Sequence, residues 1–384
     1  MNITIITGGF PTPLEPGKYA FVDQLACAWA DQGHDITVIC PVPFFVELFD
    51  KKRFYKNEWQ RITEQQNSLK VICPRYMGLS NKKIAGIRTK NLSYCSVRRA
   101  IIRAIKRNGK AVDFLYAHFL PQGCHAGDIG EKMGIPAYCA FGESSLWSIK
   151  NMDLEKVKKS LAKLRGIISV SSENKKVLSE NGLFREADII VLPNGVDHEL
   201  FYPRNKTEVR KKLGFPEEQF IGAYVGAFNE SKGSLRAQKA AVDAGDTKMI
   251  FIGGGSDTPK GDNILFSGRL QHEDIPEYLS AADFFILPTK AEGCCNAIIE
   301  AMACGLPVIS SNGVYNDDIL SEEYSIRIAP SDVGGMKNAI KLLRDNPIQR
   351  KKMSITAETA SQRFDVFRRA EEIIRFMVQK AEGR

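Results

Sequence analysis

The sequence has no apolar run long enough to cross a membrane. Its longest apolar stretches, at 283–288 and 298–308, are interrupted or far shorter than the roughly 20 residues that a membrane-spanning helix needs. Residues 1–7 lack a basic leader and a small-residue cleavage site, so we expect a first strand there rather than a signal peptide. These absences predict a cytoplasmic protein.

Paired cysteine motifs are also missing. The nine cysteines are scattered, mostly inside apolar runs, and none belongs to a CxxC pair or a His/Cys set. We therefore expect reduced thiols. Only the adjacent Cys294 and Cys295 suggest an alternative, because neighbouring thiols in a turn can be redox-sensitive.

Two ligand-binding signatures are absent. The sequence has no Asp-x-Asp, the pair of carboxylates that commonly holds a divalent metal on a diphosphate. We therefore expect neither a metal nor another cofactor. No GxGxxG follows the first expected strand, which argues against a nicotinamide-dependent dehydrogenase.

Length and composition indicate two globular domains. At roughly 150 residues per domain, 384 residues suffice for two full cores. Hydrophobic residues make up 43% and charged residues 26%, which is ordinary for a globular protein and argues against disorder.

Strand and helix patterns alternate along almost the whole chain, which predicts an α/β protein with parallel sheets covered by helices. The first series starts with a strand at 2–7, a helix at 18–32 and a strand at 35–40. Turn residues at 193–195 break the rhythm before a second series begins. Further strands are expected at 112–117, 136–141, 166–171 and 188–192, then at 221–225, 249–253, 264–266, 284–288, 307–310 and 325–328, with one or two helices at 353–380. Two doubly wound domains follow, with ligand-binding residues in the loops after strands.

The loop after the strand FFILP carries the most chemistry. It runs from Thr289 to Asn296 and leads into the helical run AIIEAMAC. A helix N-terminus beside a loop suits a pyrophosphate. Glu300, about one turn inside the helix, is placed to accept from a vicinal diol, while Glu292 meets another part of the same ligand. From spacing alone, a turn residue at 292 and a solvated helix residue at 300 are the alternative.

The segment AADFFILPTKAEGCCNAIIEAMACGLPVISSN resembles the C-terminal signature of the GT-B fold, retaining glycosyltransferases of family 4 (glycosyl transferases group 1). In that signature two glutamates bracket seven residues and EAMACGLPV follows. PNGVD, VGAFNESKG, IGGG and FSGRL occur in the family's order. The resemblance implies two Rossmann-like domains facing each other across a cleft. Residues 1–193 would form the acceptor-side domain, with a C-terminal helix at about 364–384 packing back on it, and 194–363 the donor-binding domain.

In the second domain, the resemblance implies a site for a nucleotide-sugar donor. Glu300 would bond the ribose hydroxyls, Glu292 the sugar hydroxyls, and Lys232 would neutralise the diphosphate. Arg269 would supply a second cation, with a salt bridge at the core edge as the alternative. The other donor-side residues are Gly226, Gly254, Gly293, Cys294, Cys295 and Asn296. Ala227 departs from the family pattern, which has Arg there, so one phosphate contact is missing.

In the first domain, His118 follows the strand DFLYA and matches a histidine that lines the family's cleft. We assign it to donor phosphate or sugar contact rather than to general-base duty. Gly8, Gly9 and Gly17 belong to the loop after the first strand, where close backbone approach to a ligand requires glycine. The resemblance turns this loop toward the acceptor. Glu143 in FGESS matches a common Asp of an HGSD-like segment, also on the acceptor side.

The net charge of +8 comes from one segment of the chain. Residues 51–110 contain seventeen Lys or Arg and only two Glu, a net +15, so the rest of the chain sums to 8 − 15 = −7. This segment is expected to lie on an anionic membrane surface with apolar side chains dipping in. Those side chains are Phe54, Tyr55, Trp59, Ile62, Val71, Ile72, Tyr76, Ile84, Ile87 and Tyr94. A solvated, loop-rich surface and nucleic-acid contact are the alternatives, although no nucleic-acid module accompanies the charges.

The resemblance and the charge pattern together imply a cytoplasmic, peripheral-membrane, retaining hexosyltransferase. Its donor would be a nucleotide diphosphate sugar, a UDP-sugar before GDP-mannose, and its acceptor a surface-polysaccharide or lipid-linked glycan. No nucleic acid is expected as a partner. A nucleotide-sugar epimerase on the same fold and a non-catalytic nucleotide-binding protein are the alternatives. Glu292 and Glu300 favour transfer, and Ala227 alone favours loss of catalysis.

Overall fold

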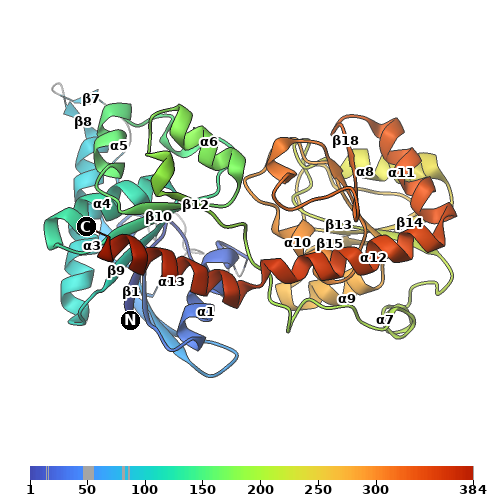
Figure 1. Ribbon diagram of the computed structural model, residues 1–384, viewed down its shortest axis with the longest axis horizontal. Coiled ribbons are helices and arrows are strands. Elements are labelled where there is room, and N and C mark those ends of the chain that lie inside the picture. The colour runs from blue at the N-terminus through green and yellow to red at the C-terminus, as the bar shows by residue number, and fades with distance from the viewer. Residues whose placement is uncertain (14, 16, 46–55, 80–82, 85–86, 384) are drawn as a thin grey trace. The chain divides into compact units, whose positions relative to one another are not determined.

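The computed structural model describes residues 1–13, 15, 17–45, 56–79, 83–84 and 87–383. The chain divides into two compact units. Unit 1 comprises Met1–Leu192 and Phe367–Arg384, and unit 2 comprises Pro193–Val366. Each unit is a sheet with helices packed on its faces (Figure 1).

Unit 1 contains an eight-stranded sheet with the order β12-β11-β10-β9-β1-β2-β5-β4. The strands are β1 (Asn2–Ile6), β2 (Asp35–Ile39), β4 (Glu58–Ile62), β5 (Ser68–Ile72), β9 (Phe114–His118), β10 (Ala137–Phe141), β11 (Gly166–Ser169) and β12 (Ile189–Val191). All neighbours pair in parallel except β4, which runs antiparallel to β5 at one edge. Two short pairs lie outside this sheet: β3 (Val42–Pro43) with β6 (Arg75–Tyr76), and β7 (Lys83–Ile84) with β8 (Ile87–Arg88).

Helices cover both faces of the unit 1 sheet. They are α1 (Ala20–Asp31), α3 (Thr89–Asn108), α4 (Leu120–Met133), α5 (Leu154–Leu161), α6 (Ser172–Glu180) and α13 (Val366–Glu382). On one face, Nε1 of Trp29 in α1 donates to the carbonyl of Ala370 in α13 at 3.0 Å, and the Tyr138 hydroxyl donates to the carbonyl of Met377 at 2.6 Å. Side chains alternate along a strand, so Cys139 points to the other face, into a cluster shared with α3, α4 and α5. The dark red α13 therefore lies on the α1 face of unit 1 (Figure 1).

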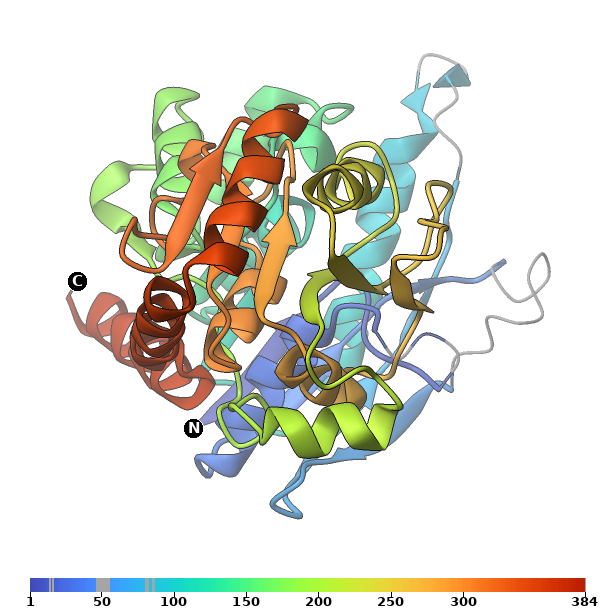
Figure 2. The same ribbon diagram turned by 90° about the vertical axis from the view of Figure 1, so that its right-hand side faces the viewer.

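Unit 2 contains a six-stranded, fully parallel sheet with the order β15-β14-β13-β16-β17-β18. The strands are β13 (Phe220–Val225), β14 (Thr247–Ile252), β15 (Ile264–Gly268), β16 (Phe284–Leu287), β17 (Val308–Ser311) and β18 (Ser325–Ile328). Its helices are α7 (Lys206–Leu213), α8 (Ser234–Ala244), α9 (Ile275–Ser280), α10 (Asn296–Ala303), α11 (Val333–Asp345) and α12 (Pro347–Ser361). The central strands read as continuous apolar runs because α8 with α11, and α10 with α12, bury them from both sides (Figure 2).

The α/β class and the division into two units, each built on a mainly parallel sheet, are confirmed. Local details differ from the sequence expectation, which placed no strand between 41 and 111 and so lacked β5 of the main sheet. Helix α1 begins at Ala20 rather than at 18, because Tyr19 adopts a left-handed conformation with φ 57° and breaks the helix there. The antiparallel strand β4 was not expected, since its exposed, charged sequence gives no buried-strand pattern. None of the described helices is long and apolar enough to cross a membrane.

Candidate functional site

The predicted donor-side residues lie in loops at one edge of the unit 2 sheet. Gly226 follows β13, residues 253–255 follow β14, Arg269 follows β15, and the loop from Thr289 follows β16. Because these four strands are parallel, all of these loops lie at the carboxyl edge of the sheet. The sheet therefore gathers residues from four loops that are far apart in the sequence.

Lys232 and Glu292 form an ion pair between two of these loops. Their side chains are 27% and 12% exposed, so the pair is largely shielded from solvent. The backbone supports it from both sides. The Lys232 N–H donates to Oδ1 of Asn229 at 2.8 Å, and the Lys290 N–H donates to the carbonyl of Ser231 at 2.9 Å. The cation predicted for a diphosphate and the carboxylate predicted for a sugar are thus neighbours.

Glu300 lies one turn inside α10 and is only 8% exposed, so it is not a solvated helix residue. Its Oε1 atom accepts a hydrogen bond from Nε2 of His272 at 3.0 Å. Burial lowers the pKa of His272, but the hydrogen bond and charge of Glu300, with further help from Glu273 and Asp197, outweigh burial and raise it. The imidazole ring also packs 5.1 Å from the ring of Phe201.

Sequence analysis missed His272. It stands in a 3-10 turn (His272–Asp274) immediately after the FSGRL motif, in a chain with five histidines. Its position in a loop after a strand was the feature of the sequence that could have identified it as a site residue. The partner, Glu300, is 28 residues further along the chain, and only the folded sheet brings the two together.

Close backbone packing requires a glycine at position 253, in the loop after β14. The Gly226 N–H donates to the carbonyl of Ile252 at 2.9 Å. A Cβ atom on Gly253, whose φ is +148°, would lie 1.9 Å from the carbonyl oxygen of Gly226. A Cβ atom on Gly254 would lie 2.8 Å from Nε of Arg269. The loop after β14 is therefore packed too tightly for a side chain at 253, whereas at 254 only the exposed side chain of Arg269 would have to move.

Arg269 is exposed and lies against Gly254. Within the described ranges no ion pair involves its guanidinium, so the salt bridge given above as an alternative is not formed there. Ala227 is exposed as well, and its carbonyl accepts from the Tyr224 hydroxyl at 2.9 Å. This edge thus presents an exposed arginine at 269 and no side-chain cation at 227.

The loop that begins α10 is tied to the PNGVD turn. The Asn194 N–H donates to Sγ of Cys294 at 3.4 Å, and its Nδ2 donates to Oδ1 of Asn296 at 2.7 Å. Gly293 is buried in the same loop. Cys295 is the N-cap of α10 and gives the first turn no side-chain hydrogen bond. Burial raises the pKa of its thiol well above the usual value, which keeps it protonated, and all nine cysteines are free.

In unit 1, His118 is the last residue of β9 and is 5% exposed. Its ring lies 5.3 Å from Tyr116 and 5.4 Å from Phe21 of α1. Burial, together with the positive charge of Arg369, lowers its pKa to about 3, so the imidazole is neutral at ordinary pH. Its assignment to donor phosphate or sugar contact stays a prediction.

The glycine loop of unit 1 packs tightly at two of its three predicted positions. A Cβ atom on Gly8 would lie 2.8 Å from Nε2 of Gln122, and one on Gly9 would lie 2.6 Å from the ring of Tyr19. Around Gly17 the described residues leave open space, so packing does not require glycine there.

Glu143, which follows β10, is buried. Burial raises its pKa, and its Oε2 atom accepts only a long hydrogen bond, 3.4 Å, from the Ser148 N–H. Tyr19 and Phe119, the residues directly before α1 and α4, both adopt positive φ angles, 57° and 71°, and their ring centroids are 5.7 Å apart. Such strained residues are concentrated at functional sites in proteins, which supports a functional role for this end of the sheet.

The basic segment at 51–110 is folded rather than loop-rich where the structure describes it. It contains β4, β5, β6 and the 20-residue helix α3. The expectation that Val71 dips into a membrane is wrong, because Val71 is fully buried in the core of unit 1. Tyr94 is also engaged, since its ring stacks on His125 at 4.1 Å. Phe54 and Tyr55, and the side chains of Ile84 and Ile87, lie outside the described residues.

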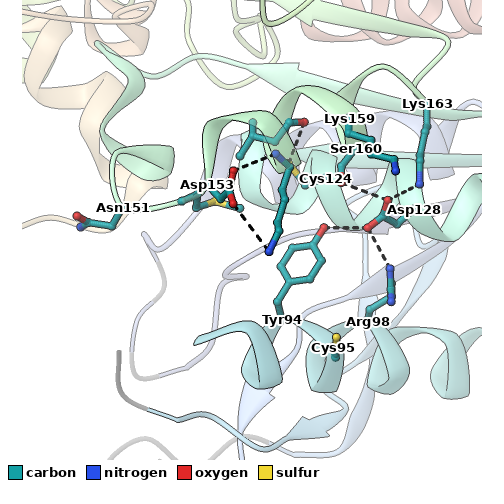
Figure 3. A pocket seen from close by; sticks show the side chains of 13 residues that line it. Tyr94, Cys95, Arg98, Cys124, Asp128, Asn151, Asp153, Lys159, Ser160 and Lys163 are labelled. Atoms are coloured by element: carbon teal, nitrogen blue, oxygen red, sulfur yellow. Dashed lines mark hydrogen bonds and ion pairs between the residues drawn. The ribbon is translucent and has the colours of Figure 1, made fainter. Parts of the chain in front are cut away.

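A pocket of about 700 Å³ lies among α3, α4 and α5 of unit 1, and none of the predicted donor-side or acceptor-side residues lines it (Figure 3). Asp128 forms its wall and accepts from Tyr94, Arg98, Ser160 and Lys163 at 2.8 to 3.2 Å. Although burial raises the pKa of Asp128, Lys163 and these other donors hold it below its usual value. The carboxylate therefore joins the three helices as a structural centre.

The chain is similar to known glycosyltransferases. The family described as "Glycosyl transferases group 1" matches residues 205–360, and "Glycosyltransferase Family 4" matches 20–200. The chain is 26% identical over 385 residues to the putative teichuronic acid biosynthesis glycosyltransferase TuaC of Bacillus subtilis, covering 96% of each chain. It is 29% identical over 202 residues to the UDP-Gal:alpha-D-GlcNAc-diphosphoundecaprenol alpha-1,3-galactosyltransferase of Escherichia coli, covering 47% of this chain and 52% of that one.

The fold also matches solved structures. Sucrose-phosphate synthase from Thermosynechococcus elongatus superimposes with a TM-score of 0.77 over 100% of both chains, at 18% identity. At that identity the likeness concerns the fold alone. Together, the two family matches, the full-length relative and the paired Rossmann-like sheets show that this chain belongs to the group 1 glycosyltransferases of the GT-B fold.

Proposed function

We propose that this glycosyltransferase moves a hexose, with retention of configuration and without a metal ion, from a nucleotide diphosphate sugar to a surface-polysaccharide or lipid-linked glycan. A UDP-sugar is the first choice of donor and GDP-mannose the second. The observation that carries the proposal is the placement of Glu292, Glu300 and Lys232 at one edge of the unit 2 sheet. The printed names of the two relatives, teichuronic acid biosynthesis and a UDP-Gal donor with a diphosphoundecaprenol acceptor, support the same substrate classes.

The chemistry at this edge suits departure of a nucleoside diphosphate. When the bond between the sugar C1 and the phosphate oxygen breaks, negative charge develops on the diphosphate. Lys232, the exposed Arg269 and the N-terminus of α10 supply positive charge and N–H donors for it. Glu292 would bond sugar hydroxyls and Glu300 the ribose. The acceptor oxygen then attacks C1 from the face that the phosphate leaves, and the departing phosphate takes the acceptor proton.

The acceptor side is assigned to unit 1. Gly8, Gly9 and Gly17 would face the acceptor, with Glu143 beside them, and His118 would contact the donor phosphate or sugar. The buried Glu143 has unused hydrogen-bonding capacity, since no described group donates to its Oε1 atom. A neutral His118 donates or accepts one hydrogen bond without adding charge, which suits sugar contact better than proton transfer.

We further propose that the enzyme works at the cytoplasmic face of a membrane, with unit 1 held there by its basic segment. Lys70, Arg75, Arg103 and Arg107 line a pocket of about 460 Å³ whose acidic lining residue is Glu58. Such a group of cations attracts anionic headgroups. The charge-reversed pair Arg103→Glu and Arg107→Glu should then weaken co-sedimentation with phosphatidylglycerol vesicles. A matched control, Lys351→Glu with Lys352→Glu on α12, should leave it unchanged, and equal binding of both variants to the vesicles would remove the membrane proposal.

The catalytic proposal is tested by incubating the protein with UDP-hexoses or GDP-mannose, with EDTA, and with or without a lipid-linked saccharide. We expect nucleoside diphosphate release that depends on the acceptor, and an NMR spectrum of the product with the donor's anomeric configuration. Glu292→Ala and Glu300→Ala should each reduce that release in folded protein. A sugar product formed without acceptor would indicate an epimerase instead, and inverted configuration would remove the retaining mechanism.

A further inference from the structure

Glu300 has one described hydrogen-bond partner, His272, although its side chain is only 10% exposed. A buried carboxylate needs such a partner, because its charge is costly to remove from water. One N–H occupies one of the roughly four lone-pair positions on a carboxylate. The Oε2 atom and the second lone pair of Oε1 therefore stay available for other donors, such as a pair of vicinal hydroxyls.

His272 is itself held in place. It lies in the 3-10 turn after β15, and its ring is 5.1 Å from that of Phe201. Among the described residues, the charged groups that act most strongly on it are Glu300, Glu273 and Asp197, all acidic. A ring fixed between an aromatic side chain and carboxylates can present Nε2–H to Glu300 and thereby fix the rotamer of that side chain.

We infer that His272 is a positioning residue that orients Glu300 toward the ribose of the nucleotide and offsets its negative charge beside the diphosphate. This inference rests on the proposed function, because it presupposes that Glu300 binds a ribose. His272 acts through Glu300 and does not touch the sugar that is transferred.

A charge-offsetting role makes nucleotide binding pH-dependent in a defined direction. The three carboxylates raise the pKa of His272 above its usual value, so the cationic form persists at higher pH than for a free histidine. As pH rises through that pKa, the proton is lost and Glu300 becomes an uncompensated anion near the diphosphate. Nucleotide affinity should therefore fall with rising pH across this range.

The test is isothermal titration of the folded protein with the best-binding nucleoside diphosphate and with its 2′-deoxy form, between pH 5.5 and 8.5. We expect His272→Ala to bind the ribonucleotide about 10- to 100-fold more weakly, the size of a lost hydrogen bond to a charged group. Its affinity for the 2′-deoxy form should fall much less. His272→Gln keeps an N–H donor but carries no charge, so it should bind about as the wild type does at high pH and should lack the gain in affinity that the wild type shows as the pH is lowered.

His198→Ala is the matched control, because His198 is a half-buried histidine of unit 2 that contacts the carbonyl of Ser361. It should bind both nucleotides as the wild type does. Equal loss of ribo and deoxy binding in His272→Ala, or no loss, would overturn the inference while leaving the proposed function intact. A wild-type protein that binds no nucleotide would instead remove the proposed function itself.

Discussion

The ammonium group of Lys232 forms an ion pair with the carboxylate of Glu292, across 60 residues of sequence. The pair joins the loop that precedes α8 to the loop that precedes α10, and both loops lie at the carboxyl edge of the unit 2 sheet. The ion pair holds both charged side chains near the site where we place the donor's sugar and diphosphate. This ion pair explains why a lysine and a glutamate occur together at this edge of the sheet.

Loss of the Lys232 cation should impair turnover far more than folding. We expect Lys232→Ala to lower kcat by about 100- to 1,000-fold, because a fixed donor to developing negative charge contributes on that scale. Lys239→Ala is the control, since Lys239 is an exposed residue of α8 paired with Asp243. Steady-state donor turnover measures the effect, and comparable rates for the two variants would rule out a role for Lys232 in charge stabilisation.

An arginine at position 227 should strengthen nucleotide binding. Ala227 is exposed at the sheet edge, whereas related sequences are expected to have Arg there. Ala227→Arg adds a charge-assisted donor for the diphosphate, so we expect about 3- to 10-fold tighter binding of a nucleoside diphosphate. Titration calorimetry at low and high salt checks this, and the gain should shrink as salt screens the charge. Weaker binding than wild type would mean that the diphosphate lies elsewhere.

The carboxylate of Asp283 should contribute strongly to the stability of unit 2. It is 9% exposed and accepts from Arg210 at 2.8 Å, from Lys206 at 2.7 Å and from the Ile221 N–H at 2.8 Å. Breaking such a buried network typically costs about 3–5 kcal/mol. We expect Asp283→Asn to lower the free energy of unfolding by an amount of that order, measured by urea unfolding at pH 7.

The same carboxylate should also make unit 2 acid-sensitive. Burial raises the pKa of Asp283, but Lys206, Arg210 and the Ile221 N–H outweigh burial and lower it. In the unfolded chain this carboxyl has its ordinary, higher pKa of about 3.9, so it binds a proton at a higher pH than in the folded protein. The stabilisation is therefore present above the unfolded pKa and is lost as the pH falls through the folded value. Between pH 5 and pH 2, the free energy of unfolding of Asp283→Asn should therefore fall less than that of the wild type. Asp243→Asn, at an exposed pair, should behave as the wild type does.

A side chain at position 253 should disrupt the donor-side loops. The Cβ atom of Gly253→Ala would lie 1.9 Å from the Gly226 carbonyl oxygen, in a backbone conformation with φ +148°. We expect a loss of stability of about 1–3 kcal/mol from backbone strain, accompanied by weaker nucleotide binding. Gly334→Ala, in the more open environment of α11, is the control and should be neutral or stabilising. Unchanged nucleotide binding in Gly253→Ala would contradict this packing argument.

The sequence was sufficient to predict the fold class and the family, because both depend on local signals. Strands such as β13 and β16 are short, continuous apolar runs, and the loop around Glu292 matches a dense motif. Edge features escaped prediction. The strand β4 is exposed along most of its length. Its sequence therefore lacks the alternation of apolar and polar residues that would predict a strand paired with β5.

Contacts between loops that are far apart in the sequence could not be predicted either. The partnership of His272 with Glu300 depends on adjacent loops of the folded sheet, and a lone histidine carries no sign of its partner. The core position of Val71 was missed for a related reason. The segment around it is rich in Lys and Arg and so resembles a protein surface. Alternation along β5 nevertheless turns Val71 inward, while Lys70 and Ile72 are less buried.

The central claim, that the edge of unit 2 with Glu300 binds a nucleotide diphosphate, is tested most directly by thermal unfolding with UDP, GDP, ADP and CMP. A ligand at 100 times its Kd stabilises the folded state by about 2.7 kcal/mol, which corresponds to a rise in Tm of about 5 to 10 °C for a unit of this size. We expect one nucleoside diphosphate, UDP first, to raise the Tm of the wild type, and Glu300→Ala to lose that rise. No shift with any nucleotide, or an equal shift in Glu300→Ala, would contradict the claim.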